Sequence, residues 1–321
     1  MGQKKRTIIR GILLVCVVSM LLIGVLLLHL WEQHAPYADM ETEAAATTEA
    51  ALQVKENLTT ILIMGLDKYQ APLDAMGYLN DQQADFLMLA VLDRDAKVCD
   101  VLHLNRDTMT EIRRLGIGSK EAGRFVGQLA LAHTYGSGGS DSCLNTVRAV
   151  SDLLKGVKID HYLAVTMDGV GALNDLVGGV TVEVLDDMTD FDPALVKGQT
   201  VTLHGDQALL YVRTRAGLAD STNLHRMERQ RQYLSALYSR IMEKLREDEN
   251  FLTGSLTQLA GCFKSDCTVN QLNDLGKLLS ECTLHPFLTL EGEAVKGEEF
   301  IEYYVDPDSL TATLRKLFTV Q

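Results

Sequence analysis

The sequence predicts an α/β/α sandwich with a central mixed β-sheet, preceded by one N-terminal transmembrane helix. Residues 11–30 form one continuous apolar run. From residue 58 onward, strand-like runs interleave with helical patterns, which is typical of a sheet covered by helices. Two of the strand-like runs are joined by a short turn, so the sheet contains an antiparallel hairpin and is mixed.

The apolar run at residues 11–30 is long enough to span a bilayer. Twenty residues with a rise of about 1.5 Å each cross a hydrocarbon core of about 30 Å. Four basic residues precede the run and no acidic residue occurs before Glu32. The N-terminus is therefore expected inside and the rest of the chain outside. No small-residue cleavage site follows Leu30, which favours an uncleaved signal anchor.

We therefore expect four segments along the chain. Residues 1–10 are a short basic cytoplasmic segment, and residues 11–31 are the transmembrane signal anchor. Residues 32–57 contain six acidic side chains and no strand-like apolar run, which predicts an extracytoplasmic stalk. Residues 58–321 form the folded domain.

The charge balance argues against a nucleic-acid partner. Beyond residue 31 the chain has 26 basic and 43 acidic residues, a formal charge of −17. Phosphate backbones select a basic surface instead. An anionic substrate would need a local basic pocket within this acidic body.

Five cysteines lie outside the predicted span, and the odd number excludes complete pairing within the chain. Cys262 and Cys267 are the closest pair in sequence. One disulfide bridge there and buried small thiols are both open interpretations.

The elements of the folded domain follow from periodicity and turn residues. Strands are expected at residues 59–65, 85–92, 97–104, 161–165 and 180–184. Helices are expected at residues 126–134, 142–154, 168–177, 205–211 and 224–245. Asn223 is a natural N-cap for the last of these helices. The remaining residues, up to Gln321, are expected to supply one or two helices and two strands that complete the same sheet.

Arginines occur where the chain leaves these elements. Arg106 follows a buried strand and so emerges at a sheet edge, where α/β proteins bind ligands. Arg213 and Arg215 flank Thr214, and an extended backbone would point both guanidinium groups the same way.

The long helix carries a further set of polar side chains. Arg226, Arg229 and Gln230 have the spacing that places them on one face near the helix N-terminus. Several guanidinium groups that converge in an acidic protein suit a pyrophosphate. The alternative is a set of surface salt bridges with acidic neighbours, namely Asp107, Asp220 and Glu228.

Two aspartates mark the ends of neighbouring strands. Asp67 follows the first strand and Asp85 opens the second. Adjacent strand ends bring both carboxylates to one hard cation such as Mg²⁺, which would bridge phosphate oxygens. Strand-end capping is the competing interpretation.

Taken in order, these residues resemble the LytR-CpsA-Psr family across roughly residues 58 to 320, and the family's N-terminal anchor is matched as well. The matching pieces are LIMGLD at 62–67, ADFLML at 84–89, NRDT at 105–108, IDHY at 159–162, LVGGV at 176–180, LHGDQALLYVRTR at 203–215 and RMERQ at 226–230.

The resemblance implies a phosphotransferase with residues 58–321 as its catalytic domain. Its substrate would be a polyprenyl-pyrophosphate-linked glycan, its acceptor peptidoglycan and its metal Mg²⁺ on the pyrophosphate. The glycan would be a teichoic acid, a capsular polysaccharide or another wall polymer. A single-pass protein of the cell membrane of a Gram-positive bacterium is implied.

The resemblance also assigns roles residue by residue. Asp67 and Asp85 would hold the metal. The phosphate-binding residues would be Arg106, Arg213, Arg215, Arg226 and Gln230. An apolar tunnel for the lipid tail is implied, with candidate lining residues Val170, Leu173, Leu176, Val177, Leu209 and Leu210, for each of which ordinary core packing is the alternative.

Two positions depart from the family pattern. Gln83 stands where the family commonly has arginine, which removes one phosphate contact. Asn223 stands where it commonly has aspartate, which removes a possible general base. The catalytic candidates that remain are Arg106, Asp85 and Asp220.

Two rival functions use the same residues. A lipid-pyrophosphate phosphatase would pass the phosphate to water. A non-catalytic binding or sensing protein would hold polyprenyl pyrophosphate without turnover.

Overall fold

The computed structural model describes residues 55–67, 82–214 and 223–320. The predicted cytoplasmic segment, signal anchor and nearly all of the stalk lie outside these ranges. None of the helices in the described part of the chain has the length and apolar character needed to cross a bilayer.

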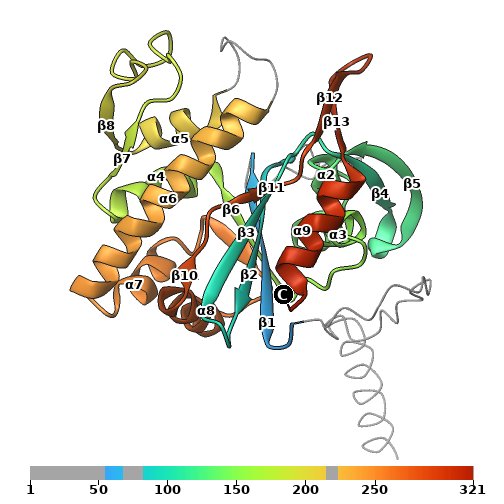
Figure 1. Ribbon diagram of the computed structural model, residues 1–321, viewed down its shortest axis with the longest axis horizontal. Coiled ribbons are helices and arrows are strands. Elements are labelled where there is room, and N and C mark those ends of the chain that lie inside the picture. Colours follow the sequence, from blue (N-terminus) through green and yellow to red (C-terminus); the bar gives the residue numbers. More distant parts are fainter. Residues whose placement is uncertain (1–54, 68–81, 215–222, 321) are drawn as a thin grey trace, which may run out of the picture. The chain divides into compact units, whose positions relative to one another are not determined.

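A seven-stranded sheet forms the centre of the domain (Figure 1). Its strands are β1 (Leu58–Leu66), β2 (Ala84–Asp93), β3 (Val98–Leu104), β6 (His161–Thr166), β9 (Phe263–Ser265), β10 (Thr283–Leu284) and β11 (Leu288–Thr289). The order is β10-β3-β2-β1-β6-β9, and β11 pairs with β3 as well. Because β2 is antiparallel to both β1 and β3 while β6 is parallel to β1, the predicted mixed sheet is confirmed.

Helices cover both faces of this sheet, as Figure 1 shows. On one face, α3 (Gly139–Leu153) and α9 (Pro307–Phe318) pack on alternate strand residues such as Leu62, Leu89 and Leu102. On the other face, α6 (Leu224–Glu247) and α8 (Val269–Glu281) cover the intervening residues, including Met88 and Val101. Strand side chains alternate between faces, so each strand contributes to both apolar layers. The predicted α/β/α sandwich is therefore confirmed.

A second apolar core lies between the other face of α6 and a small subdomain. This subdomain consists of α4 (Met167–Leu176), the hairpin of β7 (Val180–Glu183) and β8 (Thr200–Leu203), and α5 (Asp206–Arg213). Val180, Leu203 and Tyr211 are fully buried there. Because α6 contributes to both cores, it fixes α5 relative to the sheet.

The remaining elements lie between or beyond these layers. They are β4 (Met109–Leu115), the 3-10 helix η1 (Ile117–Ser119), β5 (Glu121–Gln128), α2 (Leu131–Thr134), α7 (Phe251–Gln258), β12 (Gly292–Lys296) and β13 (Ile301–Val305). β4 pairs with β5 and β12 pairs with β13, each as a separate antiparallel hairpin.

Two sequence predictions about these elements were wrong. The helix expected at residues 126–134 is the end of β5 followed by the single turn of α2. Val126, the first residue of the expected helix, is 66% exposed on the hairpin. The C-terminal part contains three helices rather than one or two, and five strands rather than two; β9, β10 and β11 complete the central sheet as predicted, whereas β12 and β13 do not join it.

A β-bulge interrupts the pairing of β1 and β2 at the edge where the polar residues gather. Gly65 pairs with Phe86 and Leu66 pairs with Ala84, so Asp85 is the extra residue without a partner. Bulges re-aim side chains and are frequent beside active sites. A Cβ on Gly65 would lie 2.9 Å from the Cβ of Phe86, so this pairing needs glycine.

Candidate functional site

The bulged Asp85 carboxylate is the centre of an arginine–carboxylate cluster. The Nη1 atom of Arg106, which follows β3, donates to Asp85 Oδ1. The Nη2 atom of the same guanidinium donates to Gln83 Oε1. Arg106 is only 8% exposed. Gln83 therefore orients the guanidinium of Arg106, a contact that the comparison with the family pattern did not predict.

A second arginine–carboxylate pair, Arg213 with Asp67, lies beside the pair of Arg106 with Asp85. Asp67 follows β1 directly, and its backbone N–H donates to the carbonyl of Gln83 at 3.3 Å. Arg213, the last residue of α5, donates from Nη2 to Asp67 Oδ1 at 3.1 Å. Both side chains are partly exposed, so the pair contributes little stability and is accessible to a ligand.

The N-terminal turn of α6 closes the cluster from the other side. Arg226 Nη1 lies 3.8 Å from Asp85 Oδ2, and Arg226 is 4% exposed. Asn223 accepts a hydrogen bond from Arg226 Nε at 2.7 Å and donates one to Asn105 Oδ1 at 2.9 Å. Asn223 is the N-cap residue as predicted, but its side chain makes no capping bond and instead holds Arg226 in place.

Two further α6 residues hold the end of α5. Arg229 is fully buried, and it donates to the carbonyls of Tyr211 and Thr214 and to the Asp186 carboxylate. Gln230 Nε2 donates to the Val212 carbonyl at 3.0 Å. These bonds fix the backbone on which Arg213 stands. The predicted phosphate contact of Gln230 stays a prediction.

The structure thus brings together five of the predicted charged residues, contributed by β1, β2, α5, α6 and the segment after β3. They are Asp67, Asp85, Arg106, Arg213 and Arg226. Arg229, which was also expected in this set, binds the end of α5 and Asp186 instead, and Arg215 and Asp220 lie outside the described residues. Arg213 is the last residue of α5, so the extended backbone that was expected to align Arg213 with Arg215 is absent at Arg213.

The donor set of this cluster fits the predicted metal. Carboxylate oxygens are the ligands that Mg²⁺ prefers, and the Asp67–Gln83 backbone bond places the two carboxylates on adjoining strand ends. Each carboxylate is paired with an arginine. A metal would therefore have to share these carboxylates with, or take them from, the guanidinium groups.

The predicted lipid-tunnel residues lie mainly in the second core. Val170, Leu173 and Leu210 are half-buried against it, and Val177 is fully buried within it. Leu176 and Leu209 are half-buried as well. None of them lines either of the two pockets described next, so their tunnel role stays a prediction.

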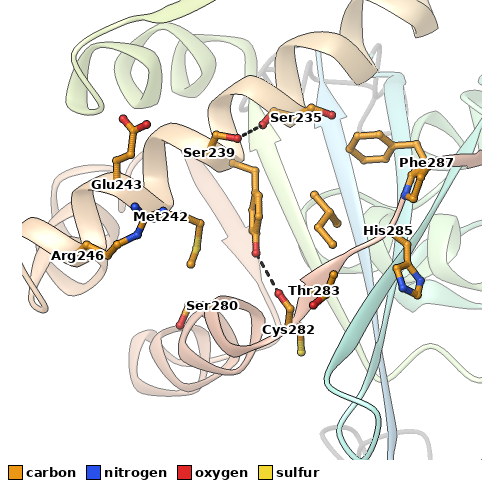
Figure 2. Close-up of a pocket in the computed structure, with 13 residues that line it drawn as sticks. Ser235, Ser239, Met242, Glu243, Arg246, Ser280, Cys282, Thr283, His285 and Phe287 are labelled. Atoms are coloured by element: carbon orange, nitrogen blue, oxygen red, sulfur yellow. Dashed lines mark hydrogen bonds between the residues drawn. The ribbon is translucent and has the colours of Figure 1, made fainter.

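A pocket of about 610 Å³ lies farther along α6, between that helix and the segment after α8 (Figure 2). Met242 and Tyr238 line it from α6, and Leu284, Pro286 and Phe287 line it from the other side. The sequence did not single out these residues, because they become neighbours only when α6 packs across β10.

A second pocket, of about 390 Å³, adjoins the cluster at the start of α6. Asn105, which precedes Arg106, is part of its lining, together with Arg231, Glu291 and Tyr303. The lining is rich in polar groups.

His103, on β3, is one of two fully buried histidines in the described part of the chain. His103 is 1% exposed, its ring lies 5.1 Å from that of Phe86, and its Nδ1 has no hydrogen-bond partner among the described residues. Burial, together with the charges of Arg231 and Arg226, lowers the pKa of His103 from 6.5 to about 3. The imidazole is therefore neutral at physiological pH.

His103 should make the protein sensitive to acid. Between pH 6.5 and about 3 the unfolded chain binds a proton at this residue and the folded chain does not, so the free energy of unfolding falls as the pH falls. The loss attributable to His103 approaches about 1.4 kcal/mol per pH unit within this window. Urea unfolding at pH 4, 5, 6 and 7 should show a shallower slope of the unfolding free energy against pH for His103→Met than for the wild-type protein. An unchanged slope in His103→Met would contradict this assignment.

The fold and the cluster define a class: an α/β/α domain with a rim of arginines and carboxylates suited to a phosphorylated ligand. The chain belongs to the LytR_cpsA_psr family, whose model matches residues 28–318. The resemblance found in the sequence is therefore confirmed.

Known relatives agree with this membership. The polyisoprenyl-teichoic acid–peptidoglycan teichoic acid transferase TagU of Bacillus cereus (strain AH820) is 28% identical over 261 residues, 79% of this chain and 76% of the relative. Among solved structures, TagV of B. subtilis has a TM-score of 0.60 at 23% identity, over 81% of this chain and 95% of that chain. TagT bound to LIIa-WTA has a TM-score of 0.61 at 19% identity, over 82% and 90%. These two structural matches support the fold.

Proposed function

We propose that this protein is a phosphotransferase that moves a glycopolymer from a polyprenyl-pyrophosphate carrier onto peptidoglycan. The observation that carries the proposal is the contact of the bulged Asp85 with Arg106 and Arg226, beside the Asp67–Arg213 pair. Family membership and relatives that are named teichoic acid transferases support the same chemistry. The product would be a phosphodiester, and polyprenyl phosphate would leave.

The arginines would change partners when the substrate binds. A pyrophosphate offers stronger, multiply charged acceptors than a single carboxylate. Arg106 and Arg226 would turn from Asp85 to the phosphate oxygens, and Arg213 would turn from Asp67. The two carboxylates thus released would hold Mg²⁺, which supplies charge neutralisation on the non-bridging oxygens.

The acceptor hydroxyl would enter through the pocket beside Asn105. That pocket adjoins the cluster, and its polar side chains suit the hydroxyl groups of a wall glycan. Asp85 is one candidate for the base that removes the hydroxyl proton, and Asp220 is the other. The prenyl tail would lie along α6 toward the pocket that Tyr238 and Phe287 line.

We further propose that residues 11–31 anchor the protein in the cell membrane and that the folded domain lies outside. The apolar run and the basic residues before it support this orientation. A membrane-bound enzyme would meet a lipid-linked substrate at the surface where that substrate resides.

The full chain, purified in detergent, allows a direct test. It should transfer label from a polyprenyl-pyrophosphate glycan to peptidoglycan with Mg²⁺, and EDTA should abolish the transfer until Mg²⁺ is restored. Free glycan phosphate that accumulates equally well without acceptor would indicate the phosphatase instead. Substrate binding without any turnover in Mg²⁺ would indicate the non-catalytic binding protein.

A further inference from the structure

We propose that His161, Asp266 and Cys267 form a second metal site, for a borderline-soft divalent cation such as Zn²⁺. One ligand atom from each side chain lies within 4.8 Å of the other two. The three residues, here called the edge triad, lie outside the arginine–carboxylate cluster and take no part in the proposed transfer reaction.

The fold places the edge triad at one side of the central sheet. His161 is the first residue of β6 and pairs with Ile61 in the middle of β1. Asp266 and Cys267 follow directly on β9, which pairs with β6 at the sheet edge. The next residue, Thr268, is the N-cap of α8. Residues about 105 positions apart in the chain therefore meet at one point.

The ligand atoms are held in place by other bonds. Asp266 Oδ1 accepts a hydrogen bond from the Tyr162 N–H at 2.9 Å, while Oδ2 lies 3.3 Å from His161 Nδ1. The Cys267 N–H donates to Ser265 Oγ at 3.0 Å, and the Cys267 Sγ lies 3.9 Å from Asp266 Oδ1. A tetrahedral Zn²⁺ with bonds of about 2.0–2.3 Å separates its ligand atoms by about 3.3–3.8 Å. Small side-chain rotations would suffice.

The chemistry of the triad selects the metal. An imidazole, a carboxylate and a thiolate together suit Zn²⁺, whereas Mg²⁺ avoids sulfur. In this structure the Cys267 thiol donates to Asp266 Oδ1, and a bound cation would displace the thiol proton and lie between the two groups. Among the described residues no lysine or arginine forms an ion pair with Asp266, whose only such partner is His161. Water would complete the fourth position, because the site is partly exposed.

The metal would act on stability rather than on the transfer reaction. The far end of β6, Thr166, pairs with Leu66 next to the cluster. His161 is five residues away along the strand, which corresponds to about 16 Å. A cation in the edge triad would join β6 to the start of α8 and so fasten the edge strand β9.

Cobalt provides a direct probe of the site. The full chain, purified in detergent and stripped of metal under reducing conditions, is titrated with Co²⁺ and then with Zn²⁺. We expect one equivalent of Co²⁺ to produce a near-ultraviolet thiolate-to-cobalt absorption band that Zn²⁺ removes. The Tm of the wild-type protein should rise with Zn²⁺.

Matched variants separate this site from other thiols. Cys267→Ser should lose the band and bind Zn²⁺ at least about tenfold more weakly. His161→Gln and Asp266→Asn should weaken binding as well, and the amide oxygen introduced by Asp266→Asn still offers an acceptor to the Tyr162 N–H. The half-buried Cys262 provides the control, since Cys262→Ser should behave like the wild type.

Three results would overturn the proposal: no band in the wild type, a band that survives in Cys267→Ser, or a band lost only in Cys262→Ser. Circular dichroism of the metal-free variants checks that each has folded. His161→Gln, which keeps the thiol, tests the site independently if Cys267→Ser does not fold. None of these measurements depends on transferase activity.

Discussion

Replacement of Arg106 by alanine should reduce glycopolymer transfer by about 10²- to 10³-fold, the loss expected when a main stabiliser of transition-state charge is removed. Arg106 is buried, is oriented by Gln83 and contacts the bulged Asp85, and the neighbouring Arg226 is itself held by Asn223. The rate of transfer from a labelled lipid-pyrophosphate glycan, measured at saturating acceptor, provides the test.

Two further variants show whether the loss of activity in Arg106→Ala is specific to this guanidinium group. Arg106→Lys keeps the charge but loses the planar fork, so it should retain only part of the activity. Arg124→Ala removes a 44% exposed guanidinium from the β4–β5 hairpin, where it pairs with Glu111 and Glu121, and should transfer at the wild-type rate. Full transfer by Arg106→Ala would refute the assignment of this cluster to catalysis.

Replacement of Arg229 by methionine should have the largest effect on stability. Arg229 is fully buried, and its removal leaves the Asp186 carboxylate without its guanidinium partner and two α5-end carbonyls without donors. Breaking a buried pair in this way costs about 3–5 kcal/mol. Urea unfolding followed by circular dichroism should show this loss as a lower midpoint.

The same helix supplies the control for Arg229. Lys244→Ala removes an exposed pair with Glu247 and should change the unfolding free energy by less than about 1 kcal/mol. The double variant Arg229→Met/Asp186→Ala removes both buried charges and should regain part of the stability. If Arg229→Met unfolds at the same urea concentration as the Lys244→Ala control, the buried pair does not stabilise the α5–α6 contact.

The main sheet could be predicted from the sequence because its signals are local. Strands β1, β2 and β3 are long apolar runs bounded by turn residues, and the short turn after Asp93 fixes the hairpin. Strands β9, β10 and β11 have only two or three residues each, too few for a period to appear. These strands form because the packing of α8 against the sheet places the residues before it beside β6 and the residues after it beside β3.

The charged residues of the candidate site were predicted better than the contacts that position them. Asp67, Asp85 and Arg106 stand at strand ends, which sequence patterns can locate. The partnership of Gln83 with Arg106, and of Asn223 with Arg226, depends on side chains that are 23 and 3 positions apart and on the packing of α6. From the family pattern, Gln83 was recognised only as the loss of an arginine and Asn223 only as the loss of an aspartate. The structure gives each of them a hydrogen-bonding role.

The bulge at Asp85 separates the start of β2 from the rest of the strand. A change in residue number at the start therefore need not alter the pairing of the rest with β1. From Phe86 to Asp93 the strand is in strict register with β1, and a one-residue slip there would turn its apolar side chains to the wrong face. A change in the number of residues ahead of Phe86 can be accommodated at the bulge, so the pairing of β2 with β1 from Phe86 onward stays the same. Insertions or deletions ahead of Phe86 can therefore alter the length and aim of the ligand-facing rim while the interior remains intact.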